Sequence, residues 1–67
     1  MNYHTFATRK EANQQIAKMR GWDARPCRLY LPHDANANRN GNVWVIRCRG
    51  LGSNSDWLYL RADGYVR

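Results

Sequence analysis

The chain has 67 residues, 43% of them hydrophobic, and its 11 Lys and Arg against 5 Asp and Glu give a formal net charge of +6. This length limits it to one domain, residues 1–67, with a small core, and the hydrophobic fraction argues against a disordered chain. No apolar stretch approaches the roughly 18 residues that span a membrane, and the N-terminus lacks the apolar stretch of a secretory signal, so we expect no membrane partner and a cytoplasmic location.

The first predicted elements are a short strand and a helix. Residues Asn2–Ala7 are expected to form the strand. The motif that follows, TRKE at positions 8–11, is expected to be a capping box, with Thr8 at the N-cap and the Glu11 side chain reaching back from the third helical position. Apolar residues at helical spacing come next, and Gly21 is typical of a helix end. The sequence therefore predicts a helix over Thr8–Arg20.

Three further strands are predicted along the rest of the chain. They cover Ala24–Leu31, Val43–Arg49 and Trp57–Arg61, and a tight Asp63-Gly64 turn follows the last of them. The order β-α-β-β-β predicts a small α+β domain. Its sheet is expected to be mainly antiparallel with three to four strands, and one helix is expected to pack on one face of it.

Alternation along each strand predicts which side chains share a face. The helix side is expected to receive the apolar residues Phe6, Cys27, Leu29, Leu31, Trp44, Ile46, Cys48, Leu58 and Leu60. With only one helix in the chain, the opposite face has no predicted cover. That open face is expected to carry Arg28, Tyr30, Val45, Arg47, Arg49, Trp57, Tyr59 and Arg61. A one-residue shift in register would exchange the faces of a strand.

Arginine and aromatic residues together on one face predict a small basic binding module. Arg contacts phosphate, and aromatic rings stack on unpaired bases, so nucleic acid, DNA or RNA, is the expected partner. The candidate binding residues are Arg28, Tyr30, Arg39, Arg47, Arg49, Trp57, Tyr59 and Arg61.

Two alternatives to nucleic acid remain for the same residues. Tyr, Trp and Arg are also enriched at protein interface hot spots, which would suit a host protein or a homodimer. The small, basic, single-domain form of the chain resembles accessory proteins of phages and mobile elements, including anti-CRISPR inhibitors. Alternatively, the Arg side chains lie over the rings of neighbouring strands and only stabilise the sheet.

The sequence contains no pattern typical of catalysis or of a metal site. No two acidic residues are placed as an acid/base pair, and the glycines form no phosphate-binding motif. The spacing of His4, Cys27, His33 and Cys48 matches no zinc pattern. We therefore expect no enzyme, cofactor or metal, and we expect Cys27 and Cys48 to be buried free thiols.

A polar segment, Pro32–Gly41, joins two of the predicted strands. Asn40-Gly41 is a strong turn signal, but the connection is longer than the usual two to five residues of a hairpin loop. We expect a flexible hairpin tip. In the functional alternative it is a polar finger that extends the binding surface through His33, Asn36, Asn38 and Arg39.

Overall fold

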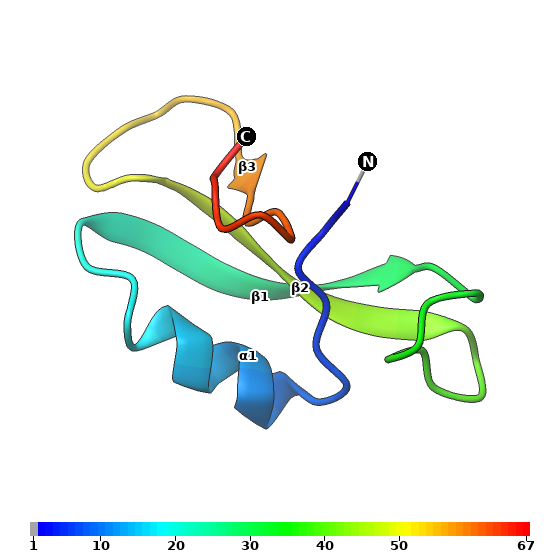
Figure 1. Ribbon diagram of the computed structural model, residues 1–67. Coiled ribbons are helices and arrows are strands. Elements are labelled where there is room, and N and C mark those ends of the chain that lie inside the picture. Colours follow the sequence, from blue (N-terminus) through cyan, green and yellow to red (C-terminus); the bar gives the residue numbers. More distant parts are fainter. Residues whose placement is uncertain (1) are drawn as a thin grey trace.

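The computed structural model describes residues 2–67 and consists of one helix packed on a three-stranded antiparallel sheet (Figure 1). Helix α1 spans Arg9–Ile16, and strands β1, β2 and β3 span Trp22–Tyr30, Asn42–Gly50 and Leu58–Tyr59. The strand order is β1-β2-β3, and α1 contacts both β1 and β2. The predicted α+β class, with one helix on a mainly antiparallel sheet, is confirmed.

Helix α1 begins as predicted and ends earlier than predicted. The Thr8 hydroxyl accepts a hydrogen bond of 3.2 Å from the backbone N–H of Glu11, as expected of a helix cap. After Ile16 the chain forms a tighter turn of the 3₁₀ type, in which the N–H of Met19 donates to the carbonyl of Ile16, three residues earlier. This tighter turn packs Met19 against the core. Gly21 then lies in the turn that leads into β1, so the prediction that it ends the helix is wrong.

The first predicted strand is present as two isolated bridges. Phe6 exchanges both backbone hydrogen bonds with Trp44 on β2, at 2.8 and 3.0 Å, and Tyr3 pairs with Arg61. Near the other end of the chain, Leu60 pairs with Val66 across a tight turn. The second edge of β2 is thus shared between the N-terminal segment and the residues around β3.

Strand β2 is buried on both of its faces. On the helix side, Ile46 forms the core together with Phe6, Ala12 and Leu60. On the opposite face Val45 is 0% exposed, although one-sided sheets leave this face in water. The N-terminal segment also lies on this face of the sheet. The Tyr3 ring contacts the ring of Tyr59, and Tyr59 pairs with Arg47, which lies on the same face as Val45. The prediction of an entirely open face is therefore wrong.

The faces of β1 are exchanged relative to the prediction. The register places Ala24, Pro26 and Arg28 directly opposite Cys48, Ile46 and Trp44, so these β1 residues lie on the helix side. Cys27 and Leu29 lie opposite Val45 and Val43 on the other face. The exchange follows from packing, because small Ala24 lets α1 approach closely while the other face has apolar residues of its own to bury. Leu31 is also outside the helix-side core and lines a surface pocket with Tyr3.

The loop that joins β1 to β2 folds back onto the N-terminal segment. Oδ1 of Asp34 accepts hydrogen bonds from the Thr5 hydroxyl at 3.0 Å and from the backbone N–H of Asn36 at 2.8 Å. The Asn36 amide donates in turn to the Thr5 carbonyl and hydroxyl oxygens. The side chain of Asn38 accepts from two backbone N–H groups further along the loop. The segment therefore does not project as an extended finger.

Both cysteines are free thiols, and they lie on opposite faces of neighbouring strands. Cys48 is fully buried, as predicted, whereas Cys27 is only half-buried. Burial raises the pKa of the Cys48 thiol. The reactive thiolate of Cys48 is therefore harder to form than that of an exposed cysteine.

Burial of Val45 predicts the effect of a substitution that preserves its shape. Val45→Thr places a hydroxyl where water cannot reach it, and we expect the free energy of unfolding to fall by about 1–3 kcal/mol. Val66→Thr, at a half-buried position near the chain end, is the matched control and should cost less. Urea denaturation measures both changes. A Val45→Thr protein as stable as wild type would mean that this face is open to water.

Thiol chemistry should separate the two cysteines in the folded protein. At pH 8, a disulfide reagent such as Ellman's reagent is expected to modify Cys27 first and Cys48 only after unfolding, because the burial of Cys48 opposes its thiolate. The Cys27→Ala and Cys48→Ala variants assign each kinetic phase. Equal rates for the two thiols in native protein would contradict the burial of Cys48.

Candidate functional site

Arginine side chains lie side by side on the face of the sheet opposite α1. Arg25 on β1 and Arg47 on β2 are directly opposite each other, and Arg49 stands opposite Asp23. Tyr59 on β3 is the partner of Arg47 on its other side. We call the following set the arginine face: Arg25, Arg47, Arg49, Trp57, Tyr59 and Arg61.

The sequence of β2 explains why the arginine face occupies only part of the sheet. Val43, Val45, Arg47 and Arg49 alternate along one face of this strand. The two valines are buried, whereas the two arginines are half-buried. The face therefore changes from apolar to cationic along β2, and its cationic part lies away from the β1–β2 loop.

Each aromatic ring of the arginine face already contacts a guanidinium group. The Cζ atoms of Arg47 and Arg49 lie 4.8 and 4.4 Å from the centroid of the Trp57 ring. The Cζ atom of Arg61 lies 4.6 Å from the Tyr3 centroid and 5.8 Å from that of Tyr59. Such contacts stabilise exposed sites by about 0.5–1 kcal/mol each. The N–H donors lie in the guanidinium plane, so stacking on a ring does not consume them, although Arg61 also donates from Nε and Nη2 to the Arg67 carbonyl.

Negative charge is scarce beside these arginines. Asp23 accepts from Nε of Arg25 at 3.3 Å and from Nε of Arg49 at 3.4 Å, so one carboxylate serves two guanidinium groups. Within residues 2–67, Arg47 has no carboxylate within 4.0 Å, and its buried Nε has no hydrogen-bond partner. Arg25 and Arg47 also face each other across neighbouring strands, where like charges repel. An anion bound to the exposed Arg25 side chain would relieve this repulsion, whereas the buried Nε of Arg47 is out of its reach.

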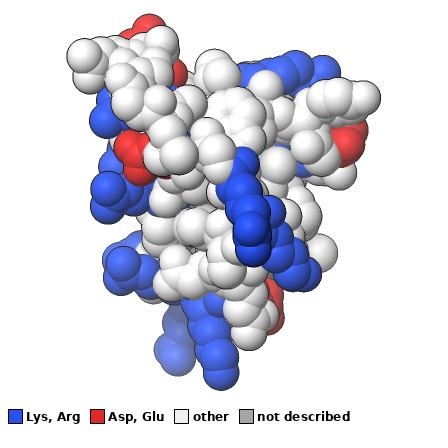
Figure 2. All heavy atoms as spheres, turned by 90° about the vertical axis from the view of Figure 1, so that its left-hand side faces the viewer, with Lys and Arg blue, Asp and Glu red and all other residues white. Residues whose placement is uncertain are grey.

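Basic side chains continue beyond the arginine face. Figure 2 views the molecule from the end where β1 begins and β2 ends, and it shows Lys and Arg side chains in several groups with uncharged atoms between them. Acidic side chains occupy only scattered places in this view. The basic character is thus spread over this end of the molecule and is not confined to a single spot.

The structure brings most of the predicted binding residues together. Three of them are placed elsewhere. Arg28 lies on the helix side with its Cζ atom 5.3 Å from the Trp44 centroid, and Tyr30 shares that side with its ring against Gly41. Arg39 lies exposed in the β1–β2 loop, at the other end of the hairpin from Arg49. The prediction that Arg28 and Tyr30 belong to the common face is wrong because the faces of β1 are exchanged. The predicted binding residues that the structure does bring together are Arg47, Arg49, Trp57, Tyr59 and Arg61.

Sequence analysis missed Arg25 and Asp23 in this site. In the predicted phase of β1, both charged side chains would have pointed toward α1. In the observed phase only Arg28 does so, and it lies over an aromatic ring. The correct assignment of the β1 faces is the one that places fewer charged side chains toward α1, and this criterion could have been applied to the sequence.

Comparisons with protein-family models, with curated proteins and with solved structures found no match for this chain. Within residues 2–67, no group of three or more His, Cys, Asp or Glu side chains is placed to hold a metal ion, and no helix is long and apolar enough to cross a membrane. The functional argument therefore depends on the geometry and charge of the arginine face.

Proposed function

We propose that the protein binds nucleic acid without catalysing a reaction, through contacts from the arginine face to backbone phosphates. The observation that carries this proposal is the shortage of carboxylates among residues 2–67: Arg25 and Arg49 share Asp23, and Arg47 has no carboxylate within 4.0 Å. Phosphate oxygens are strong acceptors, and the planar guanidinium group matches their geometry. A bound phosphate would also reduce the repulsion between Arg25 and Arg47.

The geometry favours backbone contacts over base stacking on this face. Arg25 has a side chain that is 65% exposed and can reach a phosphate, and the Arg49 side chain is 30% exposed. The Trp57 ring, in contrast, is occupied by Arg47 and Arg49. We therefore assign Trp57 a positioning role, holding the two guanidinium groups. Phosphate contacts carry no sequence information, so binding through this face is independent of sequence.

Binding of a protein is the second candidate function. The observation that favours it is a surface pocket of about 470 Å³ beside α1 and β1. Ile16, Trp22 and Leu51 contribute apolar surface to this pocket, and Leu51 is 69% exposed. A host protein, or a second copy of this chain, would cover that surface. A cytoplasmic accessory protein of a phage or mobile element would fit either partner, and the reducing cytoplasm would keep both thiols free.

Affinity for nucleic acid should depend on salt and on Arg25. Fluorescence anisotropy with labelled oligonucleotides is expected to show log affinity falling linearly with log salt, by about 0.7–0.9 per phosphate contacted. Arg25→Gln should weaken binding equally for all sequences and reduce the slope by about 1. Arg20→Gln is the matched control, because Arg20 is an exposed arginine outside the arginine face.

Two results would count against this function. Non-specific binders reach dissociation constants of about 10⁻⁴ to 10⁻⁶ M at physiological salt. An absence of binding at about 100 μM protein and low salt would therefore refute the proposal. Equal losses in the Arg25 and Arg20 variants would attribute binding to net charge alone, without a dedicated face.

Oligomeric state tests the homodimer version of the second candidate. If a second copy covers the apolar pocket, light scattering after size exclusion should show a concentration-dependent dimer, which Leu51→Glu should dissociate. Leu58→Glu is a control, because Leu58 is also an exposed leucine and lies outside this pocket. A monomer at all concentrations would remove the homodimer.

A further inference from the structure

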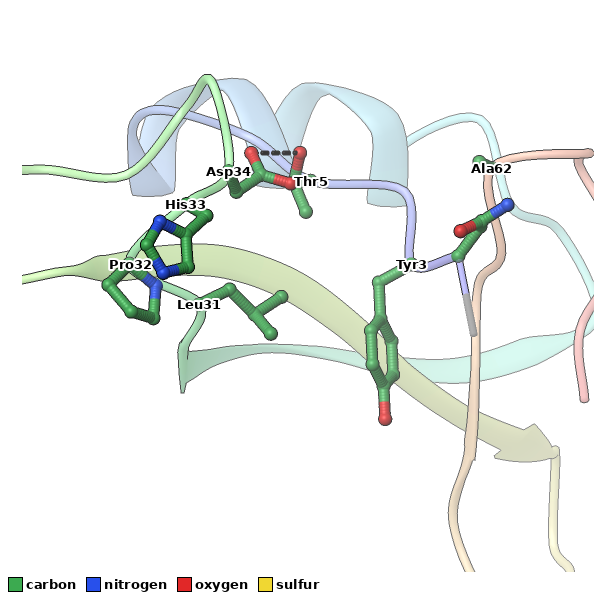
Figure 3. A pocket seen from close by; sticks show the side chains of 8 residues that line it. Tyr3, Thr5, Leu31, Pro32, His33, Asp34 and Ala62 are labelled. Atoms are coloured by element: carbon green, nitrogen blue, oxygen red, sulfur yellow. Dashed lines mark hydrogen bonds between the residues drawn. The ribbon is translucent and has the colours of Figure 1, made fainter.

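A second surface pocket, of about 420 Å³, lies between the N-terminal segment and the loop that follows β1. Figure 3 shows Tyr3 on one side of it and Leu31 and His33 on the other, with the hydrogen-bonded Thr5 and Asp34 above them. Its volume is in the range of about 300–1,000 Å³ typical of small-molecule sites. The site therefore has room for one small, flat group.

Tyr3 connects this pocket to the arginine face. One edge contact joins the Tyr3 and Tyr59 rings, with centroids 5.3 Å apart, and the Arg61 guanidinium lies over the Tyr3 ring. Ala62, the residue after Arg61, also lines the pocket. Arg61 already donates from Nε and Nη2 to the Arg67 carbonyl at 3.1 and 2.9 Å, so it contributes positive charge beside the pocket, and the phosphates of a ligand bind the other arginines of the arginine face.

The pocket lining combines apolar side chains with polar ones, and Asp34 is its one carboxylate, beside Asn2, Thr5 and His33. Tyr3, Leu31 and Pro32 provide the apolar contacts. Oδ1 of Asp34 is held by the Thr5 hydroxyl and by the backbone N–H of Asn36. Its second oxygen, Oδ2, has neither a hydrogen-bond partner nor a cation within salt-bridge distance among residues 2–67. A fixed carboxylate oxygen remains available to a ligand.

The chemistry of a carboxylate selects among possible occupants. An ionised Asp is only an acceptor, so the occupant must present N–H donors. Guanine offers two neighbouring donors on its Watson–Crick edge, whereas thymine and uracil offer one donor between two acceptors. A cationic side chain of another protein could also contact Asp34. The positive charge of Arg61, which lies over the Tyr3 ring, and the net charge of +6 would repel such a side chain.

We infer that this pocket receives one unpaired base, preferentially guanine, from a strand whose phosphates bind the arginine face. The inference rests on the proposed function. A base whose Watson–Crick edge contacts Asp34 cannot be paired at the same time, so the site requires a single strand, a loop or an end. The arginine face supplies affinity for any strand, and the pocket adds selection of one base.

Anisotropy with three single-stranded probes tests the pocket. The probes are oligo-dT, the same strand with one central dG, and the same strand with an abasic site at that position. We expect the dG strand to bind about tenfold more tightly than the abasic strand, as one added base contact allows. A duplex of the dG strand should lose this advantage.

Three variants separate base selection from folding. Asp34→Asn retains the oxygen that holds the loop but replaces the free oxygen with an amide NH₂ donor, so the preference for dG over dT should fall to about 1 while affinity for dT is unchanged. Asp56→Asn makes the same change in net charge at an exposed position outside the pocket and should keep the preference. Leu31→Trp should fill the pocket and remove the dG advantage.

The outcomes distinguish this inference from the proposed function. Salt-dependent binding of equal strength to the three single strands would overturn the base pocket and leave the arginine face as the binding site. A complete lack of binding to every probe at low salt would overturn both. Binding of a lysine-rich peptide that depends on Asp34, without any dG preference, would assign the pocket to a protein segment and overturn the inference.

Discussion

The burial of β2 on both faces is the constraint on which the rest of this structure depends. A chain of 67 residues buries only about 60% of its unfolded surface, so few residues can lie in a core. Here one strand supplies most of the fully buried side chains: Val43, Val45, Ile46 and Cys48. The helix, β1, the N-terminal segment and the residues around β3 all pair with or pack on this strand. Each of them would lose its main contact if β2 were displaced.

Two-sided burial of β2 also determines where the arginines lie. Val45 is fully buried whereas Arg47 and Arg49 are half-buried, so the charged residues of this face begin where β2 becomes partly exposed. Stacking on Trp57 lets two arginines lie close together on one strand. The buried Nε of Arg47 is the remaining cost, and a buried donor without a partner costs about 1–3 kcal/mol. This donor is closed to solvent, so an anion would stabilise the folded state by mass action only through the more exposed Arg25 and Arg49 side chains.

Sequence patterns predicted the elements more accurately than the faces they present. The capped start of α1 at Thr8 and the positions of β1 and β2 follow from local signals, namely a capping box and alternating apolar residues. The face of β1 does not, because alternation indicates the buried side only when the other side is wet. The run Val43-Trp44-Val45-Ile46 carries a usable signal, since consecutive apolar residues are typical of a strand covered on both faces.

The arginine face was predicted in part for the same reason. Arg47, Arg49, Trp57, Tyr59 and Arg61 are assembled on β2, β3 and the residues that adjoin them, so errors in β1 did not affect them. Arg25 depends on the cross-strand register, which no local pattern determines here. The folded-back β1–β2 loop was also beyond local patterns, because its anchor at Thr5 is 29 residues away from Asp34 in sequence.

The anchored β1–β2 loop and the arginine face place a negative charge and a group of positive charges close together on the surface. The hydrogen bonds from Thr5 and Asn36 hold the Asp34 carboxylate in the pocket, and Tyr3 separates that carboxylate from the cations near Arg61. A phosphate is therefore attracted to one side of the Tyr3 ring and repelled from the other. Only the uncharged, donor-rich part of a nucleotide is favoured in the pocket. In the base pocket that we propose, the Asp34 carboxylate opposes overall affinity for a polyanion, and its contribution would be to orient a bound strand with a base inward and the phosphates on the arginines.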